Sequence, residues 1–414
     1  MTSKPQQPPP IDHRWFRVAG VILIAFLGSG MSWYSMGVLF SPLVEEFGWK
    51  SGTYSAAVSI FLILMTLSSI PTGRLVDRLG ARRVMLYAAL LNGLSWGLIS
   101  QMGRLRILPT IWQLYLLYGM LAVSSAGVGG IPINAIITHW FTQKKGLAVG
   151  LSIVGFGLPG VIMVPLSGPF LATHSWRLLA LTFGALSWCV SVPCILGALR
   201  DRSQGQGTSR HRSALPGILA RDAVRMTPFW IIGISYLLAQ FGSVAVQMHA
   251  IPFLTDRGLS HEIASSIWGF LALSGIMGKI GLGYAADHIA PKKVLIVSIL
   301  LQVGGLVTAL TWPSLPAACV FALLFGLGMG GLFSTRPLLV GEYFGMRAFA
   351  TILGMIELFT LPGTAIGQSV AGFLYDLTSS YELSHTIFIG TFFLSMAILA
   401  SLSDPEQNDA RDPA

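Results

Sequence analysis

Three ionisable side chains, Lys279, Arg336 and Glu357, stand inside long apolar stretches of this sequence. A charged side chain near the centre of a bilayer costs about 2.5–3.5 kcal/mol even on the most lenient insertion scale, so such residues face a cavity or one another. An ammonium or guanidinium group can bind an anion, and a desolvated carboxyl group can carry a proton. The three residues therefore predict either a site for an anion and a proton or a buried ion pair.

Two interpretations stay open for each of these residues. Lys279 holds a carboxylate, or it forms a structural pair with Glu357; we favour the first because an intramembrane ionisable residue marks a functional site by default. Glu357 carries a proton, or it only neutralises Lys279 or Arg336. Arg336 is a second anion ligand, or it anchors the cytoplasmic gate, or it extends to the interface. Tyr34 and Tyr118 can offer hydroxyl groups to a carboxylate, although a core tyrosine is the commoner case.

The elements that must position these residues are membrane-spanning helices. Of the 414 residues, 53% are hydrophobic and 10% are charged, whereas soluble domains carry about 25% charged residues. A helix that crosses the hydrocarbon core needs roughly 20 mostly apolar residues, and the sequence contains twelve such stretches. They are 16–40, 54–75, 84–102, 111–138, 146–171 and 176–199 in the first half, and 229–254, 264–286, 294–312, 317–341, 348–374 and 387–402 in the second.

The distribution of basic residues predicts the topology. With a cytoplasmic N-terminus, 19 of the 26 Lys and Arg residues fall on the cytoplasmic side, which is the positive-inside asymmetry. The net charge of +9 therefore needs no nucleic-acid partner. The Pro-rich start is not followed by a small-residue cleavage site, so we expect no signal peptide. We predict a multi-pass protein of the bacterial inner membrane with both termini in the cytoplasm.

An internal repeat divides the chain into two halves. The segment 73–84 recurs at 283–294 with an offset of 210, and Phe141 and Pro159 recur as Phe344 and Pro362 with an offset of 203. Parallel repeats related by an axis along the membrane normal are typical of proteins that rock one half against the other around a central site. The predicted domains are a tail at 1–15, a six-helix bundle at 16–199, a linker at 200–226, a second bundle at 227–402 and a tail at 403–414.

The loop after the second predicted helix carries a specific motif. It consists of Gly73, Asp77, Arg78, Gly80, Arg82 and Arg83. This pattern resembles the cytoplasmic loop motif of the major facilitator superfamily, and the resemblance covers essentially the whole chain. It implies an all-α membrane protein of twelve transmembrane helices in two pseudo-symmetric six-helix bundles. Two further segments, 33–49 and 139–150, resemble the monocarboxylate transporter group and its bacterial relatives, which include the oxalate–formate antiporters.

The resemblance to that group implies a small carboxylate substrate, often moved with a proton. Members commonly carry a His on the seventh helix, which His249 matches, and a substrate-binding Arg on the eighth, where Lys279 stands here. Lysine offers a point charge in place of the planar fork of arginine. Gly275 stands where vertebrate members place an acidic residue. His249 is a further candidate for substrate binding and for proton transfer, or it is a hydrogen-bonded packing residue.

The loop residues predict a gate. Asp77 can accept hydrogen bonds from the N-terminus of a neighbouring helix, whose dipole favours a negative charge. Arg78, Arg82 and Arg83 can pair with acidic groups on the cytoplasmic face. Together with Gly73 and with Asp287 of the second copy, they would lock the outward-facing state and release on rocking. The alternative is that the positive charges only set the topology.

The sequence therefore predicts a secondary active transporter of a small organic anion, a monocarboxylate, which works by alternating access with proton symport. Alternatives are a carboxylate/carboxylate antiporter, efflux of an amphipathic drug and a transporter-like carboxylate sensor. There is no phosphate-binding loop and no nucleophile–base or metal-ligand constellation, so we expect neither an enzyme nor a cofactor. The expected partners are the carboxylate, a proton or counter-anion and the lipid bilayer, with a monomer as the functional unit.

Overall fold

The computed structural model describes residues 13–104, 108–141, 143–199, 216–312 and 314–403, and these are almost entirely helical. Within those ranges the only β-type pairing is an isolated bridge between Gly217 and Gly345. Most of the predicted N-terminal tail, the first part of the predicted linker and the predicted C-terminal tail after residue 403 lie outside the described residues.

The first half of the chain is a bundle of short and long helices. It comprises α1 (His13–Ala25), the π-helical turn η1 (Phe26–Gly30), α2 (Met31–Val38), α3 (Phe40–Phe47), α4 (Ser51–Leu67), α5 (Ser69–Leu79), α6 (Ala81–Ser100), α7 (Thr110–Gly127), α8 (Gly130–Trp140), α9 (Lys145–Val154), α10 (Leu158–Thr173), α11 (Trp176–Leu186), the π-helical turn η2 (Ser187–Ser191) and α12 (Val192–Ala198).

The second half is built from longer helices. It comprises the short α13 (Ala220–Ala223), then α14 (Thr227–Asp256), α15 (His261–Ala285), α16 (Pro291–Thr311), α17 (Leu315–Phe344), α18 (Phe349–Thr378) and α19 (Glu382–Ala400).

All twelve predicted membrane segments are helical, and eleven of them, in the part of the chain that the structure describes, are long and apolar enough to cross a membrane. The remaining segment forms the 20-residue helix α6. Its mean hydropathy is lowered by Arg82 and Arg83 in its first turn and by Asn92 at its middle. The prediction of an all-α membrane protein is confirmed.

The apolar runs located the helices of the first half without indicating the irregularities within them. The first predicted helix contains the π-helical turn η1, the fourth breaks between α7 and α8, and the fifth breaks between α9 and α10. Glycines at these breaks allow close approach of backbones: a Cβ at Gly155 would come within 2.4 Å of the Ile22 carbonyl oxygen, and one at Gly28 within 2.4 Å of the Val128 side chain. Neighbouring helices can satisfy the backbone groups that such breaks release.

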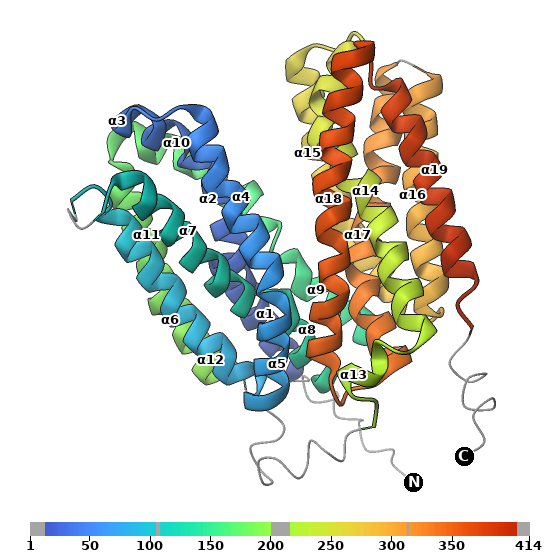
Figure 1. The fold of residues 1–414 in the computed structure, drawn as a ribbon, viewed down its shortest axis with the longest axis horizontal. Coiled ribbons are helices and arrows are strands. Elements are labelled where there is room, and N and C mark those ends of the chain that lie inside the picture. The colour runs from blue at the N-terminus through green and yellow to red at the C-terminus, as the bar shows by residue number, and fades with distance from the viewer. Residues whose placement is uncertain (1–12, 105–107, 142, 200–215, 313, 404–414) are drawn as a thin grey trace, which may run out of the picture.

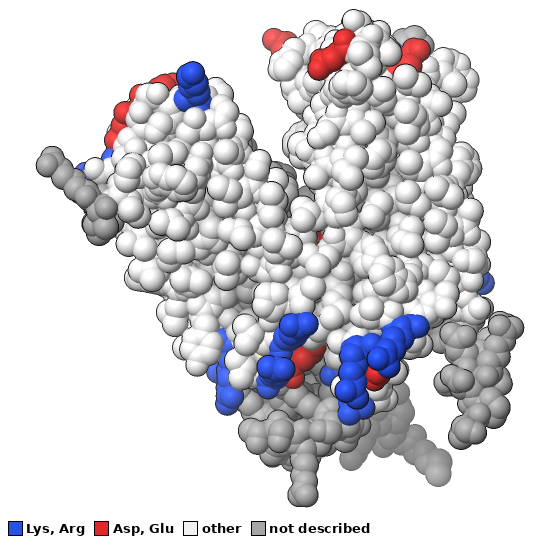
Figure 2. All heavy atoms as spheres, viewed as in Figure 1, with Lys and Arg blue, Asp and Glu red and all other residues white. Residues whose placement is uncertain are grey.

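The two halves stand side by side and meet at one end (Figure 1). We call this end, where α5 and α15 finish, the motif end, because it carries the repeated segments 73–83 and 283–293. The space-filling view shows the halves in contact at the motif end and separated toward the opposite end (Figure 2). The buried apolar side chains agree: one cluster runs from the motif end of the first half through the second half, and the other lies wholly within the first half.

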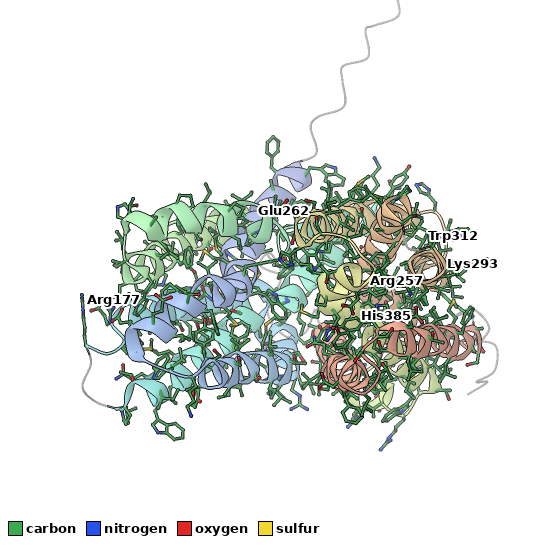
Figure 3. All side chains as sticks on the ribbon, turned by 90° about the horizontal axis from the view of Figure 1, so that it is seen from above. Arg177, Arg257, Glu262, Lys293, Trp312 and His385 are labelled. Carbon is green, nitrogen blue, oxygen red and sulfur yellow. The ribbon has the colours of Figure 1, made fainter. Side chains whose placement is uncertain are left out.

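The surface is divided by charge in a way that suits a bilayer. Lys and Arg side chains gather at the motif end, acidic side chains are concentrated at the opposite end, and the flanks between are nearly free of charge on the face shown in Figure 2. Viewed from above, Arg177 lies at the edge of the first half that is remote from the second, whereas Arg257 and His385 lie within the second half (Figure 3).

Candidate functional site

Asp77 at the motif end joins the first half to the second. Its Oδ1 accepts a hydrogen bond from the Ala350 N–H at 3.2 Å, and its Oδ2 accepts from the Thr351 N–H at 2.8 Å and the Thr351 hydroxyl at 2.5 Å. These donors belong to the first turn of α18, where backbone N–H groups have no partner within the helix. A carboxylate there is also favoured by the helix dipole.

Asp287 makes the reciprocal contact from the second half to the first. It follows α15, and its carboxylate accepts from the N–H groups of Gly146 at 2.6 Å and Leu147 at 2.9 Å, in the first turn of α9. Each Asp of the repeat therefore caps a helix of the opposite half. Separation of the halves at this end would expose both helix N-termini and break both caps.

Glycine residues allow the backbones to touch across the same two interfaces. A Cβ at Gly73 would lie 2.3 Å from the Ala350 carbonyl oxygen, and one at Gly146 would lie 2.0 Å from that of Gly283. No side chain fits at either position while the halves are in contact, because real Cβ contacts are longer than about 3 Å. The motif end is closed by direct backbone packing in this structure.

The three arginines of the loop motif differ in their contacts and exposure. Arg82 donates to the carbonyl oxygens of Ile195 at 3.3 Å and Leu196 at 2.7 Å, so it binds the end of α12 within its own half. Arg78 and Arg83 are exposed, and the described residues include no ion pair to either of them. The pairing of these three arginines with acidic groups stays a prediction.

Lys279 lies on α15 where this helix packs against the break in the fifth helix of the first half. A Cβ at Gly150 would be 2.0 Å from the Lys279 carbonyl oxygen, and a Cβ at Gly157 would be 3.7 Å from its Nζ. The side chain is half-buried, and its Nζ lies 5.6 Å from the ring centroid of Phe333. Within the described ranges no carboxylate pairs with Lys279.

Glu357 pairs with Arg336 rather than with Lys279. The Arg336 Nη1 donates to Glu357 Oε2, and only 5% of the arginine side chain is exposed against 35% of the glutamate side chain. The Arg336 guanidinium also faces two rings, with its Cζ 5.0 Å from the centroid of Tyr236 and 5.8 Å from that of Phe333. Of the two cations named as possible partners of Glu357, the structure pairs it with Arg336, and its role as a proton carrier stays a prediction.

Lys279, Arg336 and Glu357 form one layer, which we call the charged cluster. At a rise of about 1.5 Å per residue, Lys279 lies about 9 Å before the end of α15, and Arg336 and Glu357 lie about 12 Å from the motif ends of α17 and α18. Lys279 and Arg336 contact the same ring of Phe333. The cluster carries one net positive charge while Glu357 is ionised, which is suited to one anionic group.

The remaining predicted site residues are His249, Tyr118 and Tyr34, and they differ in their surroundings. His249 is about 10 Å from the opposite end of α14 by the same helical rise, and its Nδ1 lies 3.1 Å from the Tyr381 hydroxyl group. Tyr118 is buried in the first half and shares a 2.7 Å hydrogen bond with Tyr54. Tyr34 is half-buried, with its ring against Gly160. Among the described residues no contact joins His249 or Tyr118 to the charged cluster, whereas Tyr34 packs one helical turn from Gly157, the glycine beside Lys279.

One contributor to the cluster was missed from the sequence. Tyr236 on α14 is fully buried beneath Arg336, and its hydroxyl group pairs with Thr335 Oγ1 at 2.9 Å. A tyrosine within an apolar run gives no signal by itself, because its position over Arg336 depends on how α14 packs against α17. Among the described residues no three His, Cys, Asp or Glu side chains gather as a metal site requires.

The fold and the site define a class: a multi-pass membrane protein in which two repeated halves close around a polar layer. The chain belongs to the major facilitator superfamily, whose family model matches residues 22–291 and 276–414. It is a transporter family, and no enzymatic activity is expected of this chain.

Similar sequences include named carboxylate transporters. Monocarboxylate transporter 13 of Rattus norvegicus is 26% identical over 398 residues, covering 94% of this chain and 88% of the relative. Monocarboxylate transporter 11 of Homo sapiens is 26% identical over 420 residues, covering 97% and 86%. The MFS-type transporter YhjX of Escherichia coli is 24% identical over 359 residues, covering 83% and 84%.

Solved structures confirm the fold. The fucose:proton symporter FucP of E. coli superposes with a TM-score of 0.68 at 13% identity, covering 93% of this chain and 99% of that one. The proton:xylose symporter XylE superposes with a TM-score of 0.66 at 14% identity, covering 96% and 98%. At this level of identity the likeness concerns the arrangement of the helices alone.

Proposed function

We propose that this protein is a secondary active transporter of a small organic anion, a monocarboxylate, coupled to protons. The observation that carries the proposal is the Lys279 ammonium group, which has no ion pair among the described residues and lies between the two halves beside Gly157, at the depth of the Arg336–Glu357 pair. A half-buried cation without a counter-charge favours an anionic ligand. The similarity to monocarboxylate transporters supports a carboxylate as that ligand.

The proposed cycle is a rocking of the halves about the charged cluster. We place the motif end in the cytoplasm of a bacterial cell, with both termini there and the protein in the inner membrane, on the positive-inside distribution. The structure then corresponds to an outward-facing state, in which Asp77, Asp287 and Gly73 close the inner side. Release of the two helix caps opens the inner side, and the caps re-form on closure. The gating role of Arg78, Arg82 and Arg83 stays a prediction.

Glu357 is the proposed proton carrier. It lies in the same layer as Lys279, whereas His249 is near the other end of the second half. The empty layer carries one net positive charge while Glu357 is ionised. An anion at Lys279 and a proton on Glu357 together add no net charge, so the loaded layer keeps the charge of the empty one, and transport of the pair moves no net charge through the low-dielectric interior.

Flux measurements in proteoliposomes test this proposal. Purified protein is reconstituted, and uptake of labelled acetate, lactate and pyruvate is followed with and without an inward proton gradient. Proton symport predicts uptake that the gradient accelerates and that an uncoupler abolishes. Acceleration only by a carboxylate loaded inside would assign antiport instead. If none of the acids is taken up while an amphipathic cation is transported, the anion proposal is wrong.

A further inference from the structure

Asn92, at the middle of α6, is the centre of a buried hydrogen-bond network within the first half. The residue is fully buried, and its Nδ2 donates to the hydroxyl groups of Ser32 and Ser124, each at 3.2 Å. Its Oδ1 accepts from the Ser187 hydroxyl group at 3.3 Å. Both amide N–H groups therefore have partners. A buried polar network that is satisfied in this way holds its members in one arrangement.

The three hydroxyl groups come from the irregular parts of three different helices. Ser32 follows the π-helical turn η1 of the first helix and donates to the Gly28 carbonyl oxygen inside that turn at 2.6 Å. Ser124 lies on the last turn of α7, directly before the break in the fourth helix, and Ser187 is the first residue of η2 in the sixth helix. Because π-helical turns are rare and frequently occur at functional sites, a single amide that joins two of them indicates more than packing.

The turn η1 packs against the break between α9 and α10. A Cβ at Gly30, the last residue of η1, would lie 2.9 Å from the Pro159 ring and 3.1 Å from the Phe156 carbonyl oxygen. The same break faces the second half, since a Cβ at Gly157 would lie 3.7 Å from the Lys279 Nζ. Closely packed groups transmit a displacement instead of absorbing it. The position of η1 therefore determines the position of the first-half wall opposite Lys279.

The second half shows the matched position in the absence of such turns. At the offset of 210 residues Asn92 corresponds to Gln302 on α16, which is also fully buried. Its Oε1 accepts from the Ser243 hydroxyl group, and its Nε2 donates to the Ser298 carbonyl oxygen of its own helix at 3.4 Å. Ser243 lies on the continuous helix α14. A buried amide therefore recurs in the repeat, but Asn92 bonds to side chains of three other helices and Gln302 to a side chain of one.

We propose that Asn92 is a positioning residue for transport: through Ser32 it holds η1 against the break of the fifth helix and so sets the wall that faces Lys279. Asn92 acts through other residues and does not contact the ligand. The inference rests on the proposed function, because it takes Lys279 as the anion ligand. The first half, whose helices carry none of the three intramembrane charges, thereby contributes to the affinity for the ligand.

Amide hydrogen exchange of the purified full-length protein in detergent, followed by mass spectrometry, tests the network, because exchange reports local opening. Ser32→Ala removes the hydroxyl group that links Asn92 to η1 and that bonds the Gly28 carbonyl oxygen. We expect exchange at residues 26–30 and 155–158 to accelerate by about fivefold, as loss of one buried hydrogen bond implies.

Two control variants give the comparison. Ser187→Ala removes a different bond of the same network and should accelerate exchange at residues 187–191 without affecting η1 or the break of the fifth helix. Gln302→Leu, at the matched position of the second half, should leave all three segments unchanged, whereas Asn92→Leu should accelerate exchange in all of them.

Uptake of labelled lactate into proteoliposomes tests the positioning role. Ser32→Ala should raise the half-saturation concentration by about threefold and leave the maximal rate nearly unchanged, because a displaced wall weakens binding by a fraction of the free energy of one hydrogen bond. A variant that only destabilises the fold would lower the maximal rate and leave the half-saturation concentration unchanged. Ser187→Ala should change neither quantity.

The outcomes separate this proposal from the proposed function. Unchanged exchange at residues 155–158 in Ser32→Ala, or equal acceleration there in Ser187→Ala, overturns the link from η1 to the fifth helix. An unchanged half-saturation concentration in Ser32→Ala overturns the positioning role. If the unsubstituted protein takes up none of the carboxylates, the proposed function is wrong, and the exchange measurements still decide whether Asn92 holds the break in place.

Discussion

The two interfaces between the halves are related by the internal repeat, and they differ at the position of Lys279. In the first, α5 packs against α18, with Asp77 on the first turn of α18 and Ser69 donating to the Gly354 carbonyl oxygen at 2.8 Å. In the second, α15 packs against α9, with Asp287 on the first turn of α9. At the offset of 210 residues that relates Asp77 to Asp287, Ser69 corresponds to Lys279.

The comparison distinguishes the contacts that close the motif end from the charged residue that could bind a ligand. Both copies keep the Asp cap and the glycine contact, which are the parts that hold the halves together. Only the second copy replaces a small hydroxyl residue by an ammonium group. The repeat therefore places the same kinds of closing contact in both interfaces, whereas the ammonium group occurs only in the second interface.

The largest effect on carboxylate uptake is expected at Lys279, where the two interfaces differ. Lys279→Gln removes the unpaired cation, and loss of a buried charge that contacts the ligand costs about 2–5 kcal/mol. We expect carboxylate uptake in proteoliposomes to fall by about 30-fold or more. Ser69→Ala is the matched change in the first copy and should alter uptake by no more than about threefold. Equal losses in the two variants would show that the interfaces share one role.

The glycine contacts test what the copies have in common. Gly73→Val and Gly283→Val, at matched positions of the repeat, each insert a side chain where the opposing backbone leaves 2.3 Å and 2.6 Å. Overpacking costs about 1–3 kcal/mol, so both variants should shift the protein away from the state with the motif end closed.

Spin-label distances across the motif end measure that shift. Gly269→Val, on α15 with no atom within 4 Å of its Cβ, is the control and should leave the distances unchanged. If only one of the two glycine variants widened the motif end, closure would belong to one interface alone.

Removal of either Asp cap is expected to open the motif end less than the glycine variants do. Asp77→Ala and Asp287→Ala each remove an N-cap, which costs about 0.5–2 kcal/mol. The effect of Asp77→Ala should be the larger, because Asp77 also accepts from the Thr351 hydroxyl group. The same spin-label distances report both variants. The reverse order would mean that the α9 cap dominates closure.

The smallest effect, a change in stability, is expected from the ion pairs at the opposite end. Each half has one such pair, with the acidic and basic partners in the reverse order along the chain. Glu46 after the first predicted helix pairs with Arg177 at 2.6 Å, whereas Arg257 after the seventh pairs with Glu382. Partial burial by itself raises the pKa of Glu46, but hydrogen bonds from Trp176 and Arg177 and the charge of Arg177 hold it below its ordinary value of 4.5.

A carboxylate with a lowered pKa stabilises the fold above its ordinary pKa, and this contribution is lost as the pH falls through the lowered value. Glu46→Gln should therefore reduce stability by about 0.2–1 kcal/mol at neutral pH, as exposed ion pairs do. The difference should vanish in acid below the lowered pKa. Thermal unfolding in detergent at both pH values measures it, and a difference that persisted in acid would contradict the ion-pair explanation.

Much of the fold could be predicted from local signals. Apolar runs of membrane-spanning length located all twelve helices, and the offset between Asp77 and Asp287 identified the two halves. The breaks of the fourth and fifth helices were missed, because a glycine in a membrane helix is compatible with either a continuous or a broken backbone. Which occurs depends on the helix that packs against it, as Ile22 does against Gly155.

The sequence by itself determined that three charges lie within the membrane and that all of them belong to the second half, because the cost of burying charge leaves few arrangements. It could not determine which of the charges pair. Only the packing of α17 against α14 and α18 decided that Glu357 binds Arg336 and that Lys279 keeps no partner within the described residues. Pairing depends on distances of a few ångströms between helices, and these are set by side-chain packing rather than by position along the chain.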